Sequence, residues 1–389
     1  MPTKRTPRAY PAAALVKYLT DKAPIGLYLH VPFCKRKCAY CDFYSSFVSD
    51  KLLDEYTKRL ITVIKTRGGE IHRPVNTVYI GGGTPSLLGD RLIAVMNAVR
   101  ASFSVSGNAE ITLELNPDGN IKEILSAAKR AGVNRLSVGA QSGNNEMLKT
   151  LGRTHTAEDT AAAVRLARSC GFNNISLDLM IALPGSDIKS LESDLEFLSG
   201  FCAPHISVYI LKVEENTAFY KRRGTLDLPD GDGAAEQYLF MCDYLEKRGY
   251  RHYEISNFCL ENYESRHNLK YWNCEEYLGI GPAAHSFLNG RRFYYPRDLK
   301  AFINGNEPVY DCTGGDREEY IMLRLRLKEG LLFKAYKTRF KTEVPKGLIK
   351  AALPLERAGL LKITDNALAL TDRGMIVSNS IITELLENF

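Results

Sequence analysis

The sequence predicts an α/β protein: a partial (β/α)6 barrel followed by a mostly helical, winged-helix-like C-terminal domain. Three observations lead to this fold class. Six short β-rich runs alternate with helix-patterned stretches in the first half of the chain, which is the order of parallel βα units. Glycine or polar residues follow strand after strand, as at the mouth of a barrel. After about residue 315 the chain is mostly helix-patterned. A flat, doubly wound sheet remains the alternative.

The predicted strands are short and rich in β-branched and aromatic residues. They cover Ile25–Val31, Thr77–Ile80, Ile111–Leu115, Arg135–Gly139, Ile175–Ile181 and Ile206–Leu211. The helices predicted between most of them cover Asp54–Thr66, Arg91–Phe103, Ile121–Ala131, Ala157–Cys170 and Ser190–Phe201. Six such units complete the partial barrel by about residue 212.

The second half of the chain has a different pattern. A helix is predicted over Ala234–Arg248, and an aromatic and polar stretch follows at Tyr250–Phe258. Near the C-terminus, Leu361–Thr364 and Ala367–Leu370 stand among helices as a short β hairpin. We therefore divide the chain into a basic tail (1–22), the barrel with its extension (23–290) and a C-terminal domain (291–389).

The composition is that of an ordinary globular protein: 389 residues, of which 45% are hydrophobic, 10% aromatic and 25% charged. This apolar content excludes a mainly disordered chain, and no apolar run approaches the roughly 18 residues of a membrane span. The net charge of +6 comes from scattered residues and does not indicate nucleic-acid binding. The longest apolar run of the N-terminal segment is interrupted by Pro11 and Lys17 and is too short for the core of a signal peptide. We therefore expect a cytoplasmic protein.

Three of the nine cysteines stand close together. Cys34, Cys38 and Cys41 form a C-x3-C-x2-C loop shortly after the first predicted strand. The other six are dispersed, as small buried cysteines usually are in a cytosolic protein. They are Cys170, Cys202, Cys242, Cys259, Cys274 and Cys312. The odd total argues against a disulfide framework.

The loop can place three thiolates on three corners of a [4Fe-4S] cluster. Such a cluster normally takes four cysteine ligands, and no fourth cysteine is near in the sequence, so one iron stays open. An open iron can bind the amine and carboxylate of S-adenosylmethionine. Electron transfer can then cleave the C–S bond of that molecule and release a 5′-deoxyadenosyl radical. Two alternatives stay open: a structural zinc with His30 or Asp42 as fourth ligand, and a chance spacing.

Further motifs extend this pattern along the chain. They read YLHVPFCKRKCAYCDF, YIGGGTPSLL, ELNP, RLSVGAQS, LDLMIALPG, SRHNLKYW and YLGIGPAAHSF. Together they resemble the radical S-adenosylmethionine superfamily, and within it the HemN/HemW group, which comprises the oxygen-independent coproporphyrinogen III oxidases and the related heme chaperones. The resemblance covers roughly residues 22 to 380. It implies a partial (β/α)6 barrel with the cluster loop after its first strand.

Within this group, three features are similar to the heme chaperones of the HemW branch. Asp42-Phe43 follows the third cysteine, whereas the oxidases typically place a further cysteine at the second of these positions. The chain begins only about two dozen residues before the first predicted strand, so the oxidases' longer N-terminal extension is missing. The segment from His267 to Trp272 fits the HNxxYW motif of the heme chaperones.

The resemblance also implies a set of S-adenosylmethionine contacts. The glycine motif after the second strand, with Gly82, Gly83 and Thr84, is similar to the segment that holds the methionine amino group. Contacts to the same cofactor are implied for Tyr28, Tyr40, Glu114, Gln141, Arg153 and Asp178. Arg153 can pair with a carboxylate and Asp178 can accept ribose hydroxyls. Taken singly and without the family, each of these residues is more often structural.

The HNxxYW motif implies a heme site. A neutral imidazole such as that of His267 is a good axial ligand for heme iron, and Tyr271 and Trp272 can stack beside a porphyrin. Without the family, a core or loop histidine among aromatic neighbours is the simpler interpretation. His285 is a second candidate, which similarity places on the cofactor side of the barrel mouth.

Three functions follow from these expectations. The first is a heme chaperone that binds a [4Fe-4S] cluster, S-adenosylmethionine and heme, and transfers heme to an acceptor protein that the sequence does not identify. The second is an oxygen-independent coproporphyrinogen III oxidase, which converts propionates to vinyls by radical decarboxylation. The third is a zinc-stabilised binding protein. Whether the chain is an enzyme is thus left open, and a homodimer is the default assembly.

Overall fold

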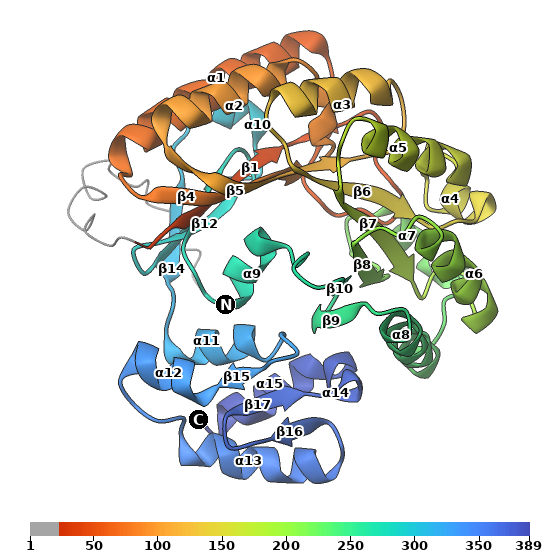
Figure 1. Ribbon diagram of the computed structural model, residues 1–389, viewed down its shortest axis with the longest axis vertical. Coiled ribbons are helices and arrows are strands. Elements are labelled where there is room, and N and C mark those ends of the chain that lie inside the picture. The colour runs from red at the N-terminus through yellow and green to blue at the C-terminus, as the bar shows by residue number, and fades with distance from the viewer. Residues whose placement is uncertain (1–22) are drawn as a thin grey trace.

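A twelve-stranded sheet organises most of the computed structural model, which describes residues 23–389 (Figure 1). The predicted basic tail, residues 1–22, lies outside the described residues. The strands follow one another in space in the order β14-β13-β12-β11-β1-β4-β5-β6-β7-β8-β10-β9. The sheet curves into an arch with helices along its convex side (Figure 1). This arch is the partial barrel that the sequence predicted.

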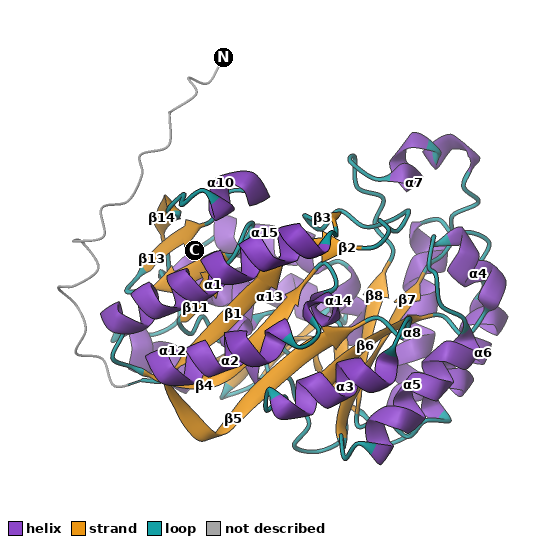
Figure 2. Cartoon of the chain, turned by 90° about the horizontal axis from the view of Figure 1, so that it is seen from above, coloured by secondary structure: helices purple, strands orange, loops and turns teal. Residues whose placement is uncertain are grey.

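Seven neighbouring strands of the sheet are parallel. They are β11 (Tyr277–Ile280), β1 (Ile25–Val31), β4 (Pro74–Gly82), β5 (Ser104–Leu115), β6 (Arg135–Gln141), β7 (Asn174–Ile181) and β8 (His205–Ile210). The connecting helices are α1 (Asp50–Glu70), α2 (Arg91–Ser102), α3 (Ile121–Arg130), α4 (Asn145–Thr150), α5 (Ala157–Ser169) and α6 (Ile188–Ser199). Figure 2 shows α1, α2 and α3 lying across the outer face of the strands. The six predicted strands and the five predicted helices of the barrel are confirmed.

Antiparallel strands extend the sheet at both edges. Beside β11 lie β12 (His285–Leu288), β13 (Arg291–Tyr294) and β14 (Val309–Thr313), and beside β8 lie β10 (Asn257–Cys259) and β9 (Arg251–Glu254). The sequence placed a domain boundary at residue 290. In the structure β13 and β14 stay in the large sheet, because their main chains pair with β12 and with each other. The architecture changes only after β14.

The two faces of β1 show how the strands position a site. Ile25, Leu27, Leu29 and Val31 are fully buried in the main apolar core, together with one face of α1. Side chains alternate along a strand, so Tyr28 and His30 face the inside of the arch. Tyr28 pairs in register with Tyr79 of β4, and Tyr79 pairs with Thr112 of β5, two residues before Glu114. Polar side chains of successive strands therefore converge on the inner face.

Short elements fill and border the arch. Helix α9 (Arg266–Trp272) lies inside it (Figure 1). The other short elements of this part of the chain are the strand pair β2 (Phe33–Cys34) and β3 (Ser46–Phe47), the helices α7 (Ala218–Lys221) and α10 (Leu299–Ile303), and the 3-10 helices η3 (Pro85–Leu88) and η4 (Arg223–Thr225). The longer helix α8 (Gly231–Glu246) follows α7 and packs against α6.

The C-terminal domain lies against the open side of the arch, next to α8 and α9 (Figure 1). Its elements are α11 (Arg317–Arg324), β15 (Leu331–Leu332), α12 (Phe333–Phe340), α13 (Lys346–Arg357), β16 (Leu361–Ile363), β17 (Ala367–Leu370), α14 (Asp372–Ile376) and α15 (Ser378–Glu387). The predicted hairpin is β16–β17, and β15 adds a third strand. Strand β15 was not predicted, because two residues are too few to show the alternation of buried and exposed side chains that marks a strand. Among residues 23–389, no helix has the length and apolarity to span a membrane.

Candidate functional site

The cysteine loop leaves the sheet at the C-terminal end of β1. Cys34 ends β2, and the pairing of β2 with β3 anchors the loop at both ends. Within the loop, the backbone N–H of Ala39 donates to the carbonyl of Leu151 at 2.9 Å, and the carbonyl of Ala39 accepts from the N–H of Phe219 at 2.9 Å. The loop is thus fixed to two distant segments of the chain. Its three cysteines all line one cavity.

This cavity has a volume of about 530 Å³ and lies at the C-terminal ends of the parallel strands. Its size is within the range of roughly 300–1,000 Å³ that is usual for small-ligand sites. Eleven residues that the sequence assigned to the cluster or to S-adenosylmethionine line it: Cys34, Cys38, Tyr40, Cys41, Gly82, Gly83, Thr84, Glu114, Gln141, Arg153 and Asp178. The structure therefore brings these residues together.

Arg153 connects the cysteine loop to the strand ends. Its guanidinium donates to Asn116 Oδ1 at 2.9 Å and to Cys38 Sγ at 3.6 Å. Asn116 in turn donates to Thr84 Oγ1 at 3.2 Å, and that hydroxyl donates to Cys34 Sγ at 3.6 Å. Two of the three sulfurs thus receive a hydrogen-bond donor. Such donors stabilise the thiolate, which is the form that binds metals.

The glycine turn that ends β4 lies against the cysteine loop. A Cβ at Gly83 would approach the carbonyl oxygen of Phe33 to 2.6 Å, and a Cβ at Gly81 would approach the Glu114 carboxylate to 2.9 Å. Gly82 has a φ of 118°, a conformation that residues with side chains rarely adopt. Because all three positions require glycine, the backbone of the turn stays open to a close ligand.

Two carboxylates face the cavity with neutral hydrogen-bond donors. Glu114 accepts from the Tyr79 hydroxyl at 2.9 Å and from the Gly82 N–H at 3.0 Å. Asp178 accepts from the Ser137 hydroxyl at 3.1 and 3.2 Å. Burial raises the pKa of Glu114 to about 7 and the pKa of Asp178 to about 6. Carboxylates of this kind gain from a ligand that brings cationic or hydroxyl donors.

Two further predicted residues complete the cavity wall. Gln141 ends β6 with a φ of 67°, in the left-handed region where non-glycine residues are uncommon and often functional. Tyr40 packs on a small apolar cluster that includes Leu151, Met180 and Phe219. Its ring is therefore held between the cysteine loop and β7.

The two residues predicted as fourth zinc ligands have other partners. His30 Nδ1 lies 2.9 Å from the Tyr28 hydroxyl, and Asp42 pairs with Arg297 at 3.7 Å. A tetrahedral zinc would need one of these side chains, or another group, to complete its coordination by the three thiolates.

Two family models match the chain: the radical SAM superfamily over residues 28–198 and the HemN C-terminal domain over residues 316–377. A relative from Lactococcus lactis named heme chaperone HemW is 35% identical over 373 residues, which cover 93% of this chain and 97% of the relative. An Escherichia coli relative of the same name is 37% identical over 317 residues, covering 79% and 83%. The chain belongs to the HemW family.

The HemW-family chain shares its fold with a solved oxidase. The coproporphyrinogen III oxidase HemN of Escherichia coli, a radical SAM enzyme, has a TM-score of 0.82 with this chain at 21% sequence identity. The match covers 96% of this chain and 92% of that one. At this identity the likeness shows the fold alone, so it does not distinguish a chaperone from an oxidase.

The predicted heme residues of this HemW-family chain lie outside the cavity wall. His267 sits on α9 with none of its surface exposed. Its Nδ1 lies 2.8 Å from Thr77 Oγ1 and its Nε2 lies 2.8 Å from the Tyr271 hydroxyl. The indole of Trp272 hydrogen-bonds to Glu254. Heme iron can reach His267 only if α9 moves and these bonds open. A role of His267 as heme ligand remains a prediction, and this arrangement does not support it.

Tyr28 also lies beneath the cavity and not on its wall. Its ring is 6.2 Å from the ring of Tyr79 and 6.4 Å from that of His267, measured between centroids. Tyr79 in turn carries the hydrogen bond to Glu114. We call Tyr28, Tyr79, His267 and Tyr271 the cavity floor. A contact of Tyr28 with S-adenosylmethionine therefore remains a prediction.

Several cavity residues escaped the sequence analysis. They are Asn116, Ser137, Tyr209, Lys212 and Arg297. Ser137 pairs in register with Ser176, and Tyr209 lies two residues after Ser207, which pairs with Asp178. The alternation of side chains along β6 and β8 could therefore have indicated both. Arg297 reaches the cavity from beyond β13, and the sequence gives no signal for that approach.

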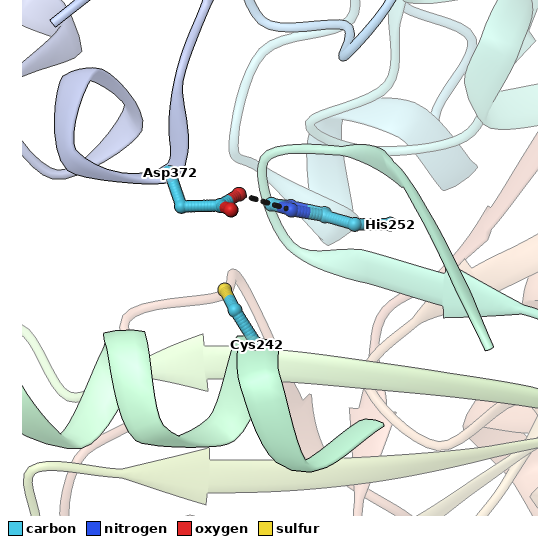
Figure 3. Close-up of side chains that lie close together, drawn as sticks. All are labelled: Cys242, His252 and Asp372. Atoms are coloured by element: carbon cyan, nitrogen blue, oxygen red, sulfur yellow. Dashed lines mark hydrogen bonds and ion pairs between the residues drawn. The ribbon is translucent and has the colours of Figure 1, made fainter. Parts of the chain in front are cut away.

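A second cluster of potential metal ligands joins the barrel to the C-terminal domain. Cys242 of α8, His252 of β9 and Asp372 of α14 place one ligand atom each within 4.8 Å of one another (Figure 3). His252 Nδ1 lies 2.9 Å from Asp372 Oδ1, and the ammonium of Lys328 donates to the same oxygen at 2.6 Å. A divalent metal would have to bind beside that positive charge. The contacts therefore indicate a structural ion pair between domains.

Proposed function

We propose that this chain is a heme chaperone that binds a [4Fe-4S] cluster, S-adenosylmethionine and heme, and transfers heme to an acceptor protein. One observation carries the proposal: eleven predicted cofactor residues converge on one cavity, in a chain whose full-length relatives are named heme chaperones. The acceptor is unidentified. The cytoplasmic location and the homodimer expected from the sequence remain predictions.

Cys34, Cys38 and Cys41 would hold three irons of the cluster. Three cysteines in one short loop that line the same cavity suit three corners of such a cluster. The hydrogen bonds from Thr84 and Arg153 would partly offset the negative charge of the cluster-bound sulfurs of Cys34 and Cys38. Bound together, the cluster and S-adenosylmethionine supply one-electron chemistry.

The remaining cavity residues suit the polar groups of S-adenosylmethionine. Glu114 and Asp178 would accept from its ammonium and its ribose hydroxyls, because both carboxylates lie at the cavity without a cationic hydrogen-bond partner. Arg153 would pair with its carboxylate. The glycine turn lets the ligand approach the backbone closely. The fit rests on donors and acceptors that the chain itself provides.

Phe43 supports the chaperone over the oxidase. It occupies the position where the oxidases typically carry a further cysteine, and 69% of its surface is exposed beside the cavity. An exposed aromatic side chain can receive a flat apolar ligand. The fold itself is common to both functions and does not decide between them.

Full-length protein, purified and reconstituted without oxygen, tests the proposal. Hemin is titrated and followed by absorbance, and the same samples are assayed for decarboxylation of coproporphyrinogen III with S-adenosylmethionine and a reductant. We expect saturable heme binding, heme loss to an apo heme protein added as acceptor, and no vinyl product. Vinyl product without saturable heme binding would replace the chaperone by the oxidase. A colourless protein with stoichiometric zinc would replace both.

A further inference from the structure

The seven histidines of the chain all lie within the described residues, and they differ in access. Five are at most 6% exposed and have hydrogen-bond partners on the ring: His30, His155, His205, His252 and His267. The two exposed ones are His72 and His285. An axial ligand must offer a ring nitrogen to iron. In this arrangement only the two exposed imidazoles can do so without movement of the fold.

These two histidines lie at opposite ends of the strands. His72 precedes β4, at the end where the parallel strands begin. His285 begins β12, which runs antiparallel to β11 and therefore starts where β11 and β1 end. The cysteine loop leaves the sheet at that same end. His285 is thus the exposed imidazole on the side of the cluster loop.

Strand register places His285 on the inner face of the sheet. Tyr28 pairs with Gly279, and Tyr277, on the same face as Gly279, pairs with Phe287. His285 is two residues from Phe287 and so shares its face. A Cβ at Gly279 would meet the carbonyl oxygen of His285 at 2.1 Å, which confirms how closely the two strands approach there. His285 and the floor residue Tyr28 therefore face the same side.

The surroundings of His285 match a heme. Its ring stacks on Tyr294 with centroids 5.2 Å apart and planes 24° from parallel, which holds the imidazole in place. Arg292, Arg297 and Asp311 are the charged groups that act on it. Arg297 also lines the cavity, as Phe43 does; it is 64% exposed, and its ion pair with Asp42 is long, at 3.7 Å. Arginine pairs well with carboxylates such as heme propionates.

We infer that heme docks on the rim of the cavity, with His285 as the axial ligand of its iron and Arg297 facing a propionate. Phe43 offers an apolar surface at the same rim. His267 is then a positioning residue, which holds Tyr271 and Thr77 within the cavity floor. The inference rests on the proposed function, because it names the site of the heme that the chaperone carries.

Hemin titration of anaerobic, cluster-reconstituted protein tests the inference with three variants. His285→Ala removes the proposed ligand, His72→Ala removes the other exposed imidazole, and His267→Ala removes the buried one. We expect His285→Ala to weaken heme binding at least tenfold and to change the absorbance of bound heme, and added imidazole to restore that spectrum. His72→Ala should bind heme as the wild type does. His267→Ala should melt at a lower temperature and, where folded, keep the wild-type heme spectrum.

The outcomes separate this inference from the proposed function. Wild-type protein that binds no heme saturably overturns the proposed function, and the rim site with it. Heme binding by the wild type that His285→Ala leaves unchanged, in affinity and spectrum, overturns the rim site alone. Loss of heme in a His267→Ala variant with wild-type circular dichroism, together with unchanged binding in His285→Ala, returns the ligand role to His267.

Arg297→Gln adds a readout of the docking position. If Arg297 faces a propionate, its loss should weaken heme binding severalfold without changing the iron spectrum, and the effect should shrink as salt is raised. The matched control is Lys300→Gln, which removes an exposed cation from the neighbouring helix α10. Equal effects of the two variants would mean that heme senses only the net charge, and would contradict the specific contact.

Discussion

Glu114 and Asp178 in the cavity and Asp372 at the domain junction are carboxylates held away from bulk water, yet they are partnered differently. Neutral hydroxyl or N–H groups donate to the first two. Asp372 accepts from His252 and from the ammonium of Lys328. The pKa of Glu114 rises to about 7, whereas these hydrogen bonds lower the pKa of Asp372 to about 2.

This difference separates a binding site from a structural contact. An acid whose pKa burial raises costs free energy in the ligand-free protein, and a ligand can recover that cost. An acid whose pKa its partners lower already contributes to folding. The shift alone does not mark a binding site, since burial also raises the pKa of Glu254, which lies outside the cavity, to about 7. Glu114 and Asp178 differ from Glu254 because they border an open volume that a ligand can occupy. The following predictions test that distinction, from the largest expected effect to the smallest.

The largest effect is expected at the cysteine loop. Cys38→Ser removes one cluster ligand together with the sulfur that accepts from Arg153. We expect iron and sulfide to fall to background and the brown colour to be lost, while far-UV circular dichroism stays that of the wild type. Iron content and visible absorbance after anaerobic reconstitution measure this.

The matched control is Cys312→Ser, because Cys312 is exposed on β14, outside the cavity. It should load iron as the wild type does. Full iron loading of Cys38→Ser would mean that Cys38 is not a ligand and would remove the basis of the cofactor assignment.

The junction should respond in stability and not in cofactor content. Asp372→Asn removes the charge that pairs with Lys328 and His252. The pKa of Asp372 is lowered from 3.8 to about 2, so the free energy of unfolding should fall by about 2 kcal/mol at pH 7. Denaturant titration measures this. Asp365→Asn, in the exposed turn of the hairpin, is the control and should change little. If Asp372→Asn abolished a stoichiometric metal, the cluster would be a metal site after all.

Opposite pKa shifts predict opposite responses to pH. The carboxyls of Glu114 and Asp178 have raised pKa values, so their contribution to stability is full below about pH 4 and is lost as pH rises through about 6 to 7. The contribution of Asp372 is present above about pH 4 and is lost as pH falls toward 2. Between pH 8 and pH 5 these two acids should therefore stabilise the iron-free protein by an amount on the order of 2 kcal/mol. The effect is measured as a difference from a variant that lacks them, because buried histidines such as His30 and His267, whose pKa values burial lowers, act in the opposite direction over the same range.

Denaturant titrations of the iron-free protein across this range provide the check. Compared with the wild type, the double variant Glu114→Gln/Asp178→Asn should become less stable at pH 5 relative to pH 8 by an amount on the order of 2 kcal/mol, whereas Asp372→Asn should keep the wild-type difference between pH 8 and pH 5. If the double variant kept the wild-type slope, the two cavity acids would be ordinary solvated carboxylates, and the contrast with the junction would disappear.

The sequence predicted the cavity far better than the junction, and the reason is physical. Glu114, Gln141 and Asp178 lie on parallel strands whose carboxyl ends meet at one edge, and the family resemblance named them. Arg153, in the loop between α4 and α5, came from the resemblance alone. The junction joins His252 of β9, Lys328 of the turn before β15 and Asp372 of α14, which are far apart in the sequence. No local spacing encodes such a meeting, because tertiary packing alone creates it.

The position of α9 shows a second limit of sequence reasoning. The HNxxYW motif identified His267 and Tyr271 as special residues, and the structure does bring them into contact at 2.8 Å. A motif, however, does not state whether a helix lies on the surface or inside the arch. Burial of His267 follows from the packing of its ring beside Gly26 and Thr77, on two different strands. The motif thus named the residues, and their burial inside the arch could be learned only from the structure.

The smallest effect, and the sharpest distinction, is expected from Glu114→Gln alone. The amide keeps an acceptor for Tyr79 or Gly82 and removes the cost of a buried charge, so the iron-free protein should gain about 1 kcal/mol of stability at pH 8. In cluster-loaded protein the same change should weaken S-adenosylmethionine binding about tenfold, since a charge-assisted hydrogen bond is lost. Denaturant titration and calorimetry measure the two effects. Higher stability together with weaker S-adenosylmethionine binding would identify Glu114 as an acid that serves ligand binding. A loss of both stability and binding would make Glu114 a structural residue like Asp372.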